Sequence, residues 1–330
     1  MIKFLIIRFS SIGDIVLTTP VIRCLKHQVE DVEIHYLTKP QFAEILQSNP
    51  NISKLHLLKE KLNDTIEELK EEYFDYIIDL HNNIRTYRIK QKLGLPAFSF
   101  KKLNYEKWLI VNFKINKLPD IHIVDRYFNT LDVFDIKNDN RGLDYYISPE
   151  NEVNISILPE SIGREYIAFV IGAKHFTKRL PIEKIISICK KINLPIILLG
   201  GKEDEKNGNN IAELSGEKVY NCCGKFNISQ SASLVKQSRV VITHDTGLMH
   251  IAAAFHKKII SIWGNTIPEF GMYPYLADEE SKIVEIKNLK CRPCTKIGFR
   301  ECPKKNFKCM NEIDDNFVAD FARKLFNDKK

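Results

Sequence analysis

The sequence predicts an α/β protein with two doubly wound domains, each a parallel sheet covered by helices. Short apolar runs without polar alternation recur in both halves of the chain, which is typical of strands buried on both faces of a parallel sheet. Segments with helical spacing separate these runs. A length of 330 residues is sufficient for two domains of ordinary size.

The expected strands are short, and we place them at residues 4–9, 33–38, 76–80, 166–172, 195–201, 218–223, 239–245 and 258–264. Residues 41–49 and 181–193 are examples of the helical spacing between them. Ser, Pro, Asn and Glu are frequent at 148–166, so we expect domains at 1–155 and 156–330, and the last helix is a candidate to pack back on the first domain. A cleft between two such domains is a natural place for a ligand.

The composition is that of a soluble globular protein. The formal charge of +7 suits an acidic substrate, a nucleotide or an anionic lipid surface, although solubility alone also explains it. The charge is too small and too dispersed to indicate nucleic acid. No apolar run is long enough to span a bilayer, and the first residues lack a secretory pattern. We therefore expect a cytoplasmic protein whose eight cysteines are reduced or metal-bound.

The stretch IIRFSSIGDIVLTTPVIRCLK, residues 6–26, passes from an apolar strand through a turn into a helix. Ser10, Ser11 and Gly13 form the turn, and Asp14 stands where the helix begins. Asp14 can cap that helix, or it can present its carboxylate to a ligand.

The segment VVITHDTGLMHIAAAF, residues 240–255, is a strand, a turn and an almost wholly apolar helix. Because such a helix must be buried, its first turn points N–H groups at whatever lies beyond the strand, and those donors suit a phosphate. Gly247 permits a close approach, His250 lies one turn into the helix, and Asp245 can be a simple cap.

Two other strand ends reach the same edge of the predicted second sheet. The first is followed by Lys174, Thr177, Lys178 and Arg179, where a lysine is a suitable counter-charge for a diphosphate. The second is followed by KEDEK, where one carboxylate can accept hydrogen bonds from ribose hydroxyls. Neither the G-x-G-x-x-G nor the G-x-x-x-x-G-K-[ST] pattern is present, which disfavours a standard dinucleotide fold and P-loop phosphoryl transfer.

Taken together, FSSIGDIVLTTPVIRCLK, TKRLP, LLGGKED and HDTGLMHIAAAF…ISIWGNTIP resemble glycosyltransferase family nine, the ADP-heptose lipopolysaccharide heptosyltransferases and their relatives. The resemblance implies a GT-B architecture, with an N-terminal acceptor domain and a C-terminal nucleotide-sugar domain. It also implies inverting transfer without a catalytic metal, from ADP-heptose to a lipopolysaccharide inner-core acceptor. Leu180, Asn265 and Ile267 depart from the family pattern near the expected nucleotide-base pocket.

The resemblance also implies roles for individual residues. Asp14 would be the general base, which typically contributes a factor of about 10²–10⁴. Ser10, Ser11 and Gly13 would present it to the acceptor. Arg85 and Arg126, near His81, Asn82, Asn83 and His122, would meet acceptor phosphates or carboxylates. The donor would be bound by a set of residues in the second half: Thr177, Lys178, Asp204, Asp245, Thr246, Gly247 and His250.

Two segments have more than one interpretation. Residues 105–119, with Trp108, Phe113 and several lysines, can rest on an anionic inner-membrane face or be an ordinary amphipathic element. Cys291, Cys294, Cys302 and Cys309 can form a structural zinc site, although their later spacings are shorter than in most zinc ribbons.

Other functions remain open at this point. A GT-B-type transferase with another donor, or an epimerase acting on a nucleotide sugar, is the nearest enzyme alternative. A zinc-stapled, non-enzymatic binding protein is the alternative from a different class.

Overall fold

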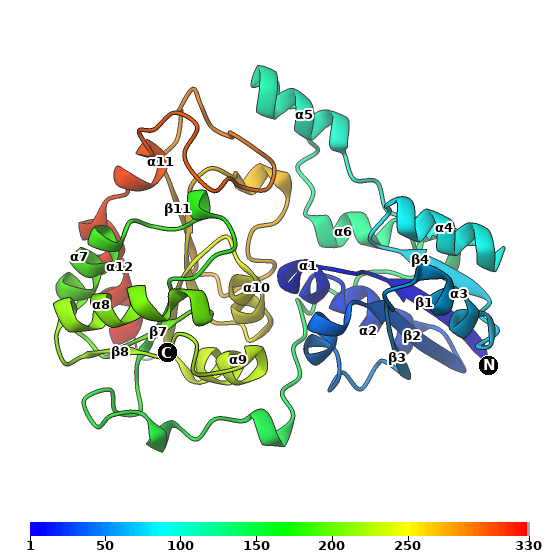
Figure 1. Ribbon diagram of the computed structural model, residues 1–330, viewed down its shortest axis with the longest axis horizontal. Helices are drawn as coiled ribbons and strands as arrows, with labels where there is room; N and C mark the ends of the chain where they lie inside the picture. The colour runs from blue at the N-terminus through cyan, green and yellow to red at the C-terminus, as the bar shows by residue number, and fades with distance from the viewer. Residues whose placement is uncertain (329–330) are drawn as a thin grey trace. The chain divides into compact units, whose positions relative to one another are not determined.

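The computed structural model describes residues 1–328, and this part of the chain forms two units with one parallel sheet each (Figure 1). The first unit comprises Met1–Leu103 and Ile121–Tyr146. The second comprises Asn104–Asp120 and the residues from Ile147 on.

The sheet of the first unit has the strand order β3-β2-β1-β4-β5 and is parallel throughout. Its strands are β1 (Ile2–Ile7), β2 (Val32–Thr38), β3 (Lys54–Leu57), β4 (Tyr76–Asp79) and β5 (Ala97–Ser99). Its α-helices are α1 (Ile12–Val16), α2 (Thr19–Gln28), α3 (Leu62–Lys70), α4 (Ile84–Leu93) and α6 (Ile123–Phe128).

Helices cover both faces of this sheet. On one face Ile66 and Leu69 of α3 and Ile89 of α4 pack on alternate residues of the central strands, such as Leu5 and Ile77. On the other face α2 lies beside α6. Helix α4 shows how the sequence sets an element's limits: the Asn83 side chain caps its start, and Gly94 ends it with φ +67°.

The sheet of the second unit has the order β11-β10-β9-β6-β7-β8, again parallel throughout. Its strands are β6 (Ile167–Val170), β7 (Ile196–Leu199), β8 (Val219–Asn221), β9 (Val240–His244), β10 (Lys258–Trp263) and β11 (Lys282–Glu285). Its α-helices are α5 (Asn104–Phe113), α7 (Ile182–Ile192), α8 (Glu205–Ser215), α9 (Ile228–Gln237), α10 (Gly247–Ala254), α11 (Lys308–Asn311) and α12 (Asp315–Asn327).

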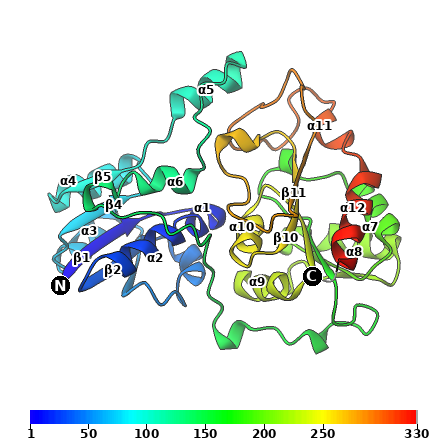
Figure 2. The ribbon, with the colours of Figure 1, turned by 180° about the vertical axis from the view of Figure 1, so that it is seen from behind.

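In this unit α7, α8 and α12 lie together on one face of the sheet, and α9 and α10 lie together on the other, as both views show (Figures 1 and 2). The apolar sides of α7 and α12 pack on buried residues of β6, β7, β9 and β10. Short 3-10 stretches connect elements in both units: Pro40–Ile45, Asp132–Phe134, Pro149–Asn151, Ile155–Ile157, Phe176–Lys178, Lys202–Asp204 and Pro268–Phe270.

The two doubly wound α/β units and all eight predicted strands are confirmed. Residues 41–49 do not form an α-helix, because this segment contains the 3-10 stretch Pro40–Ile45. The units divide at Tyr146 and Ile147 rather than at 155 and 156, and residues 104–120 pack with the second unit through Ile110, Ile267 and Phe270. The last helix packs on α7 within its own unit, and its packing on the first domain stays a prediction.

Candidate active site

In the first sheet the strand order reverses between β1 and β4, and ligands of doubly wound sheets bind beyond the carboxyl ends of strands at such a point. Asp14 lies here, in the first turn of α1, with a side chain that is 20% exposed. One carboxylate oxygen accepts hydrogen bonds from the Ser11 backbone N–H at 3.0 Å and from the Ser11 hydroxyl at 2.7 Å. The other oxygen pairs with Nη2 of Arg8 at 2.7 Å. Asp14 therefore caps the helix and is also held by a cation.

Arg8 is a residue that the sequence interpretation missed. Its guanidinium donates to the backbone oxygens of Ser10 and Leu80 and to the Tyr127 hydroxyl, in addition to its ion pair with Asp14. Burial alone lowers the pKa of Arg8, but the Asp14 carboxylate outweighs this and raises the pKa above its usual value. This network joins the ends of β1 and β4 and fixes the orientation of Asp14. The sequence feature that could have identified Arg8 is a charged residue at the end of an otherwise apolar strand.

The remaining acceptor candidates differ in exposure. Arg85, in the first turn of α4, is exposed to solvent. Arg126, in α6, is 6% exposed, and burial lowers its pKa. The His81 ring lies against the Phe9 ring in a tilted arrangement with centroids 4.8 Å apart, and burial, with the nearby Arg8 charge, lowers the pKa of His81 to about 4. Arg85 is therefore open to an anionic ligand, whereas Arg126 is almost covered.

The second sheet reverses its strand order between β6 and β9. The loops that follow these strands contain Lys178 and Asp245, whose Nζ and Oδ2 lie 2.5 Å apart. Thr266, after β10, donates its hydroxyl to the same Asp245 oxygen at 2.8 Å. The sequence predicted that Lys178 and Asp245 lie at the same edge of the second sheet. It predicted neither the ion pair between them nor the hydrogen bond from Thr266 to Asp245.

Helix α10 begins beside this ion pair. Its N-cap Thr246 makes no side-chain capping hydrogen bond, and the Thr246 hydroxyl lies 3.3 Å from that of Thr243. The N–H groups of a first helical turn have no partner within the helix, so those of α10, which starts at Gly247, can bind an anion. His250 is buried one turn further along.

Two predicted donor residues have structural contacts. Asp204 is 3% exposed, pairs with Arg179 at 2.8 Å and accepts a hydrogen bond from the Gly201 N–H at 3.0 Å. A Cβ at Gly172 would lie 2.3 Å from an Asp204 oxygen, so that loop needs glycine there. The burial disfavours the expected contact of Asp204 with ribose, which stays a prediction. The Thr177 hydroxyl accepts a hydrogen bond from the Phe299 N–H at 2.8 Å and thus anchors a later loop.

His244, the last residue of β9, was not a predicted site residue. Its Nε2 accepts a hydrogen bond from the Leu180 N–H at 3.0 Å, which ties the TKRLP segment to the end of β9. Burial lowers the pKa of His244 to about 3, so the ring is neutral at physiological pH.

Comparison with known proteins assigns the chain to a family. A model described as glycosyltransferase family 9 (heptosyltransferase) matches residues 63–305. The chain belongs to glycosyltransferase family 9. This makes it an enzyme, as the resemblance predicted, and excludes the non-enzymatic binding protein.

Similar proteins extend over the whole chain. Lipopolysaccharide heptosyltransferase 1 of Campylobacter coli is 22% identical over 359 residues, covering 99% of this chain and 100% of that protein. A family 9 glycosyltransferase from Veillonella parvula has a TM-score of 0.78 at 23% identity, covering 98% and 97% of the two chains. The E. coli heptosyltransferase WaaC, solved with ADP-2-deoxy-2-fluoro heptose, has a TM-score of 0.69 at 17% identity, covering 98% and 99%. These similarities confirm the GT-B fold.

In this family 9 glycosyltransferase, α5 has two different sides. Ile110 and Val111 pack with Ile267 and Phe270, whereas Trp108 is 51% exposed and Phe113 57% exposed. Trp108 contacts Phe113 with ring centroids 5.1 Å apart. Within residues 1–328, no helix is long and apolar enough to cross a membrane.

The four C-terminal cysteines lie in one loop region that ends in α11. Burial raises the pKa of Cys294 to about 11 and that of Cys309 to about 12, and electrostatic interaction with the neighbouring cysteines adds to both shifts. In the described part of the chain, three metal-ligand atoms converge within 4.8 Å of one another only at His35, His56 and Glu72. The thiols are therefore near one another without forming a closed set of ligands.

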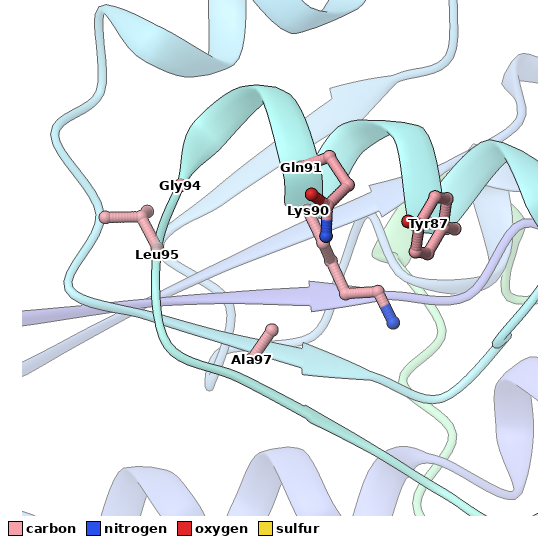
Figure 3. A pocket seen from close by; sticks show the side chains of 6 residues that line it. All are labelled: Tyr87, Lys90, Gln91, Gly94, Leu95 and Ala97. Atoms are coloured by element: carbon pink, nitrogen blue, oxygen red, sulfur yellow. The ribbon is translucent and has the colours of Figure 1, made fainter.

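A hollow of about 420 Å³ lies at the end of α4 (Figure 3). Tyr87, Lys90 and Gln91 of α4 line it together with Leu95 and Ala97. The Lys90 ammonium is used within the fold, since it bonds the Ser99 hydroxyl at 2.7 Å and pairs with Asp79 at 2.9 Å. None of the predicted site residues lines this hollow.

Proposed function

We propose that this family 9 enzyme transfers a heptose from ADP-heptose to an inner-core acceptor of lipopolysaccharide, with inversion at the anomeric carbon. The carrying observation is the Asp14 carboxylate, held by Arg8 and Ser11 at the point where the first sheet reverses its strand order. The Campylobacter coli relative supports the heptose and the lipopolysaccharide, and WaaC with a bound ADP-heptose analogue supports the donor.

In the proposed mechanism Asp14 takes the proton from the acceptor hydroxyl while that oxygen bonds to the anomeric carbon. The bond from the same carbon to the diphosphate breaks, and ADP leaves. The adjacent Arg8 cation at 2.7 Å favours the charged form of Asp14, which is the form a base requires. Ser10 and Gly13 shape the turn next to the acceptor, and Arg85 and Arg126 provide positive charge for it.

The donor diphosphate is proposed to bind at the reversal point of the second sheet. Lys178 and the first-turn N–H groups of α10 would stabilise the negative charge of the leaving group, so that no catalytic metal is needed. Thr246 is the N-cap that directly follows Asp245, and Gly247 and His250 belong to α10. Asp204 and Thr177 are expected to act by holding Arg179 and the loop at Phe299 in place.

The test compares Asp14→Asn with wild type. The amide oxygen of Asn can still accept the Ser11 N–H bond, so the start of α1 should keep its structure. ADP affinity should therefore stay within about twofold of wild type, while turnover falls by about 10²–10⁴-fold because the general base is lost. Asp64→Asn is the matched control, because Asp64 is an exposed carboxylate in the first turn of α3. Turnover in Asp14→Asn equal to that of the control would remove Asp14 from the mechanism.

Donor identity needs its own measurement. We expect ADP-heptose to raise the melting temperature more than UDP-sugars or GDP-sugars do, because a ligand stabilises the fold according to its affinity. Incubation with the donor alone separates a transferase from an epimerase, because an epimerase converts the sugar without an acceptor. A changed sugar in that reaction would refute the transferase proposal.

We also propose that α5 contacts the cytoplasmic face of the inner membrane. Tyr105, Trp108 and Phe113 are exposed on this helix, and Lys114 follows them. The double variant Trp108→Ala/Phe113→Ala should sediment less with vesicles containing anionic lipid than wild type does. Equal sedimentation would contradict the membrane contact.

A structural zinc ion on Cys291, Cys294, Cys302 and Cys309 remains a proposal as well. Thiolates are good zinc ligands, and these four lie close enough to influence one another's charge. Metal analysis of protein purified under reducing conditions tests it, and the expected result is that Cys291→Ser/Cys294→Ser holds one zinc ion per chain fewer than wild type does.

A further inference from the structure

A second group of ligand-type residues lies in the first unit, away from the predicted transfer chemistry. Nδ1 of His35 (β2) and Nε2 of His56 (β3) face each other at 3.0 Å. Glu72, which follows α3, has carboxylate oxygens 3.7 Å from His35 Nδ1 and 4.0 Å from His56 Nε2. The two imidazoles are 3% and 2% exposed, so this is a buried cluster.

The far nitrogen of each imidazole also faces a carboxylate. Nδ1 of His56 lies 3.1 Å from Glu68, and Nε2 of His35 lies 3.6 Å from Glu33. Since a carboxylate only accepts hydrogen bonds, it favours a proton on the ring nitrogen next to it. Both rings then present lone pairs to each other across 3.0 Å, which is repulsive unless a positive charge lies between them.

If His35 instead carries its proton on Nδ1, it can donate to His56. That arrangement turns the lone pair of His35 Nε2 toward Glu33 at 3.6 Å, which is again unfavourable. A cation bound by the two facing nitrogens removes both conflicts. Carboxylates behind metal-binding histidines are a common arrangement, because they fix the ring tautomer and orientation.

We propose that His35, His56 and Glu72 bind a divalent transition-metal ion such as Zn²⁺. Ligand bonds of about 2.0–2.2 Å in a tetrahedral site imply ligand separations of about 3.3 Å, close to the 3.0 Å between the two facing nitrogens. Glu72 Oε2 lies 3.7 Å from His35 Nδ1 and Glu72 Oε1 lies 4.0 Å from His56 Nε2, and one ligand atom of each residue lies within 4.8 Å of the other two. Two imidazoles and one carboxylate leave a fourth position for water.

The site has an apolar wall and a polar entrance. The Phe74 ring meets the His35 ring edge-on at 5.1 Å and the His56 ring at 6.1 Å. The side chains of Glu33 and Glu68 are 30% and 34% exposed, and each pairs with a lysine, Glu33 with Lys3 at 3.4 Å and Glu68 with Lys59 at 2.7 Å. Lys54 pairs with Glu72 and partly offsets that negative charge.

The ion would have a structural role. It would join β2, the edge strand β3 and the end of α3, and β3 has only one neighbouring strand to hold it. His35 lies in the middle of β2 and Glu72 lies before the start of β4, whereas Asp14 follows the carboxyl end of β1. We therefore expect the metal to affect stability rather than transfer, so the proposal does not depend on the proposed function.

The experiment uses the full chain, freed of metal with a chelator, in a Cys291→Ser/Cys294→Ser background that weakens any thiolate site. We expect about one Zn²⁺ per chain in equilibrium dialysis and a higher melting temperature with Zn²⁺ than without it. Co²⁺ should give the visible absorption of a nitrogen and oxygen site without a thiolate charge-transfer band. These measurements need no variant at the buried histidines, so they stand even if such variants fail to fold.

Variants then locate the ion. Glu68→Gln should weaken Zn²⁺ binding about 10–100-fold, because Glu68 supports His56 from behind. His56→Gln should abolish binding. Glu67→Gln is the matched control, since Glu67 is on the same helix with a 68% exposed side chain and should leave affinity unchanged. Failure of the parent protein to bind Zn²⁺ and Co²⁺, or unchanged stoichiometry in His56→Gln, would overturn the site.

Discussion

The ion pair of Lys178 and Asp245 permits a test that separates fold stability from donor binding. The side chains are 18% and 12% exposed, so the pair is largely but not fully buried. Removing one partner of a buried pair typically costs about 3–5 kcal/mol. Because the Thr266 hydroxyl still bonds Asp245, we expect Lys178→Met to lower the free energy of unfolding by about 2–3 kcal/mol.

The double variant Lys178→Met/Asp245→Asn should behave differently in the two assays. It leaves no unpaired carboxylate, so the free energy of unfolding should return to within about 1 kcal/mol of wild type. Donor binding should not return, because a hydrogen bond between a charged donor and phosphate is worth about 1.5–3 kcal/mol. ADP affinity in both variants should therefore be about 10–100-fold weaker than in wild type.

Urea denaturation measures the first quantity and titration calorimetry with ADP the second. Lys236→Met is the matched control, because its pair with Glu152 is 2.8 Å long but about half exposed, so its loss should cost at most about 1 kcal/mol. Recovery of ADP affinity in the double variant would show that Lys178 acts only through Asp245. Recovery of neither quantity would refute the assignment of the ion pair as a stability element.

Three further changes test other parts of the same reasoning. Arg8→Lys keeps the positive charge but cannot reproduce the several hydrogen bonds of the guanidinium group. Turnover should therefore fall at least about tenfold while ADP affinity stays unchanged. Unchanged turnover would contradict the orienting role of Arg8. His244 has a folded pKa of about 3 against an unfolded value of 6.5, so only the unfolded chain takes up this proton and stability falls as the pH drops from about 6.5 toward 3. Urea titrations at pH 7, 6 and 5 should show that the free energy of unfolding falls less steeply with pH in His244→Gln than in wild type, by up to about 1.4 kcal/mol per pH unit. Parallel declines in the two proteins would contradict the lowered pKa of His244. Gly264→Ala places a Cβ 2.8 Å from the Thr177 backbone oxygen, so thermal denaturation should show a free energy of unfolding lower by about 1–3 kcal/mol. Unchanged stability would show that the backbone at Thr177 can move away at little cost.

The central strands were predictable from sequence because burial on both faces leaves no polar alternation. All four residues of β6 and all four of β7 are buried. The strands that were not predicted are β3, β5 and β11, each three or four residues long at a sheet edge with partly exposed side chains. An edge strand has one neighbouring strand and partly exposed side chains, so fewer of its residues have to be apolar. The apolar pattern in these three segments is therefore weak.

The candidate site divides in the same way. Asp14 and the start of α10 could be located from the local sequence, since a strand, a turn and a helix follow one another there. The partners could not, because Arg8 contacts Tyr127 from a helix over a hundred residues later, and Asp245 receives Lys178 from 67 residues earlier. Such pairs follow from strand order, which single-sequence patterns do not encode.

The two reversal points both hold a cation and a carboxylate, but their surroundings make the two pairs physically different. Arg8 is 8% exposed, and backbone oxygens and a tyrosine hydroxyl fix it from several sides, so it can only hold Asp14. Lys178 is more exposed and has a flexible stem, and Thr266 remains to satisfy Asp245 if the ammonium turns to a phosphate. The proposed inverting transfer would need this difference, because the proposed base would have to stay oriented for attack while the counter-charge would have to follow the departing diphosphate.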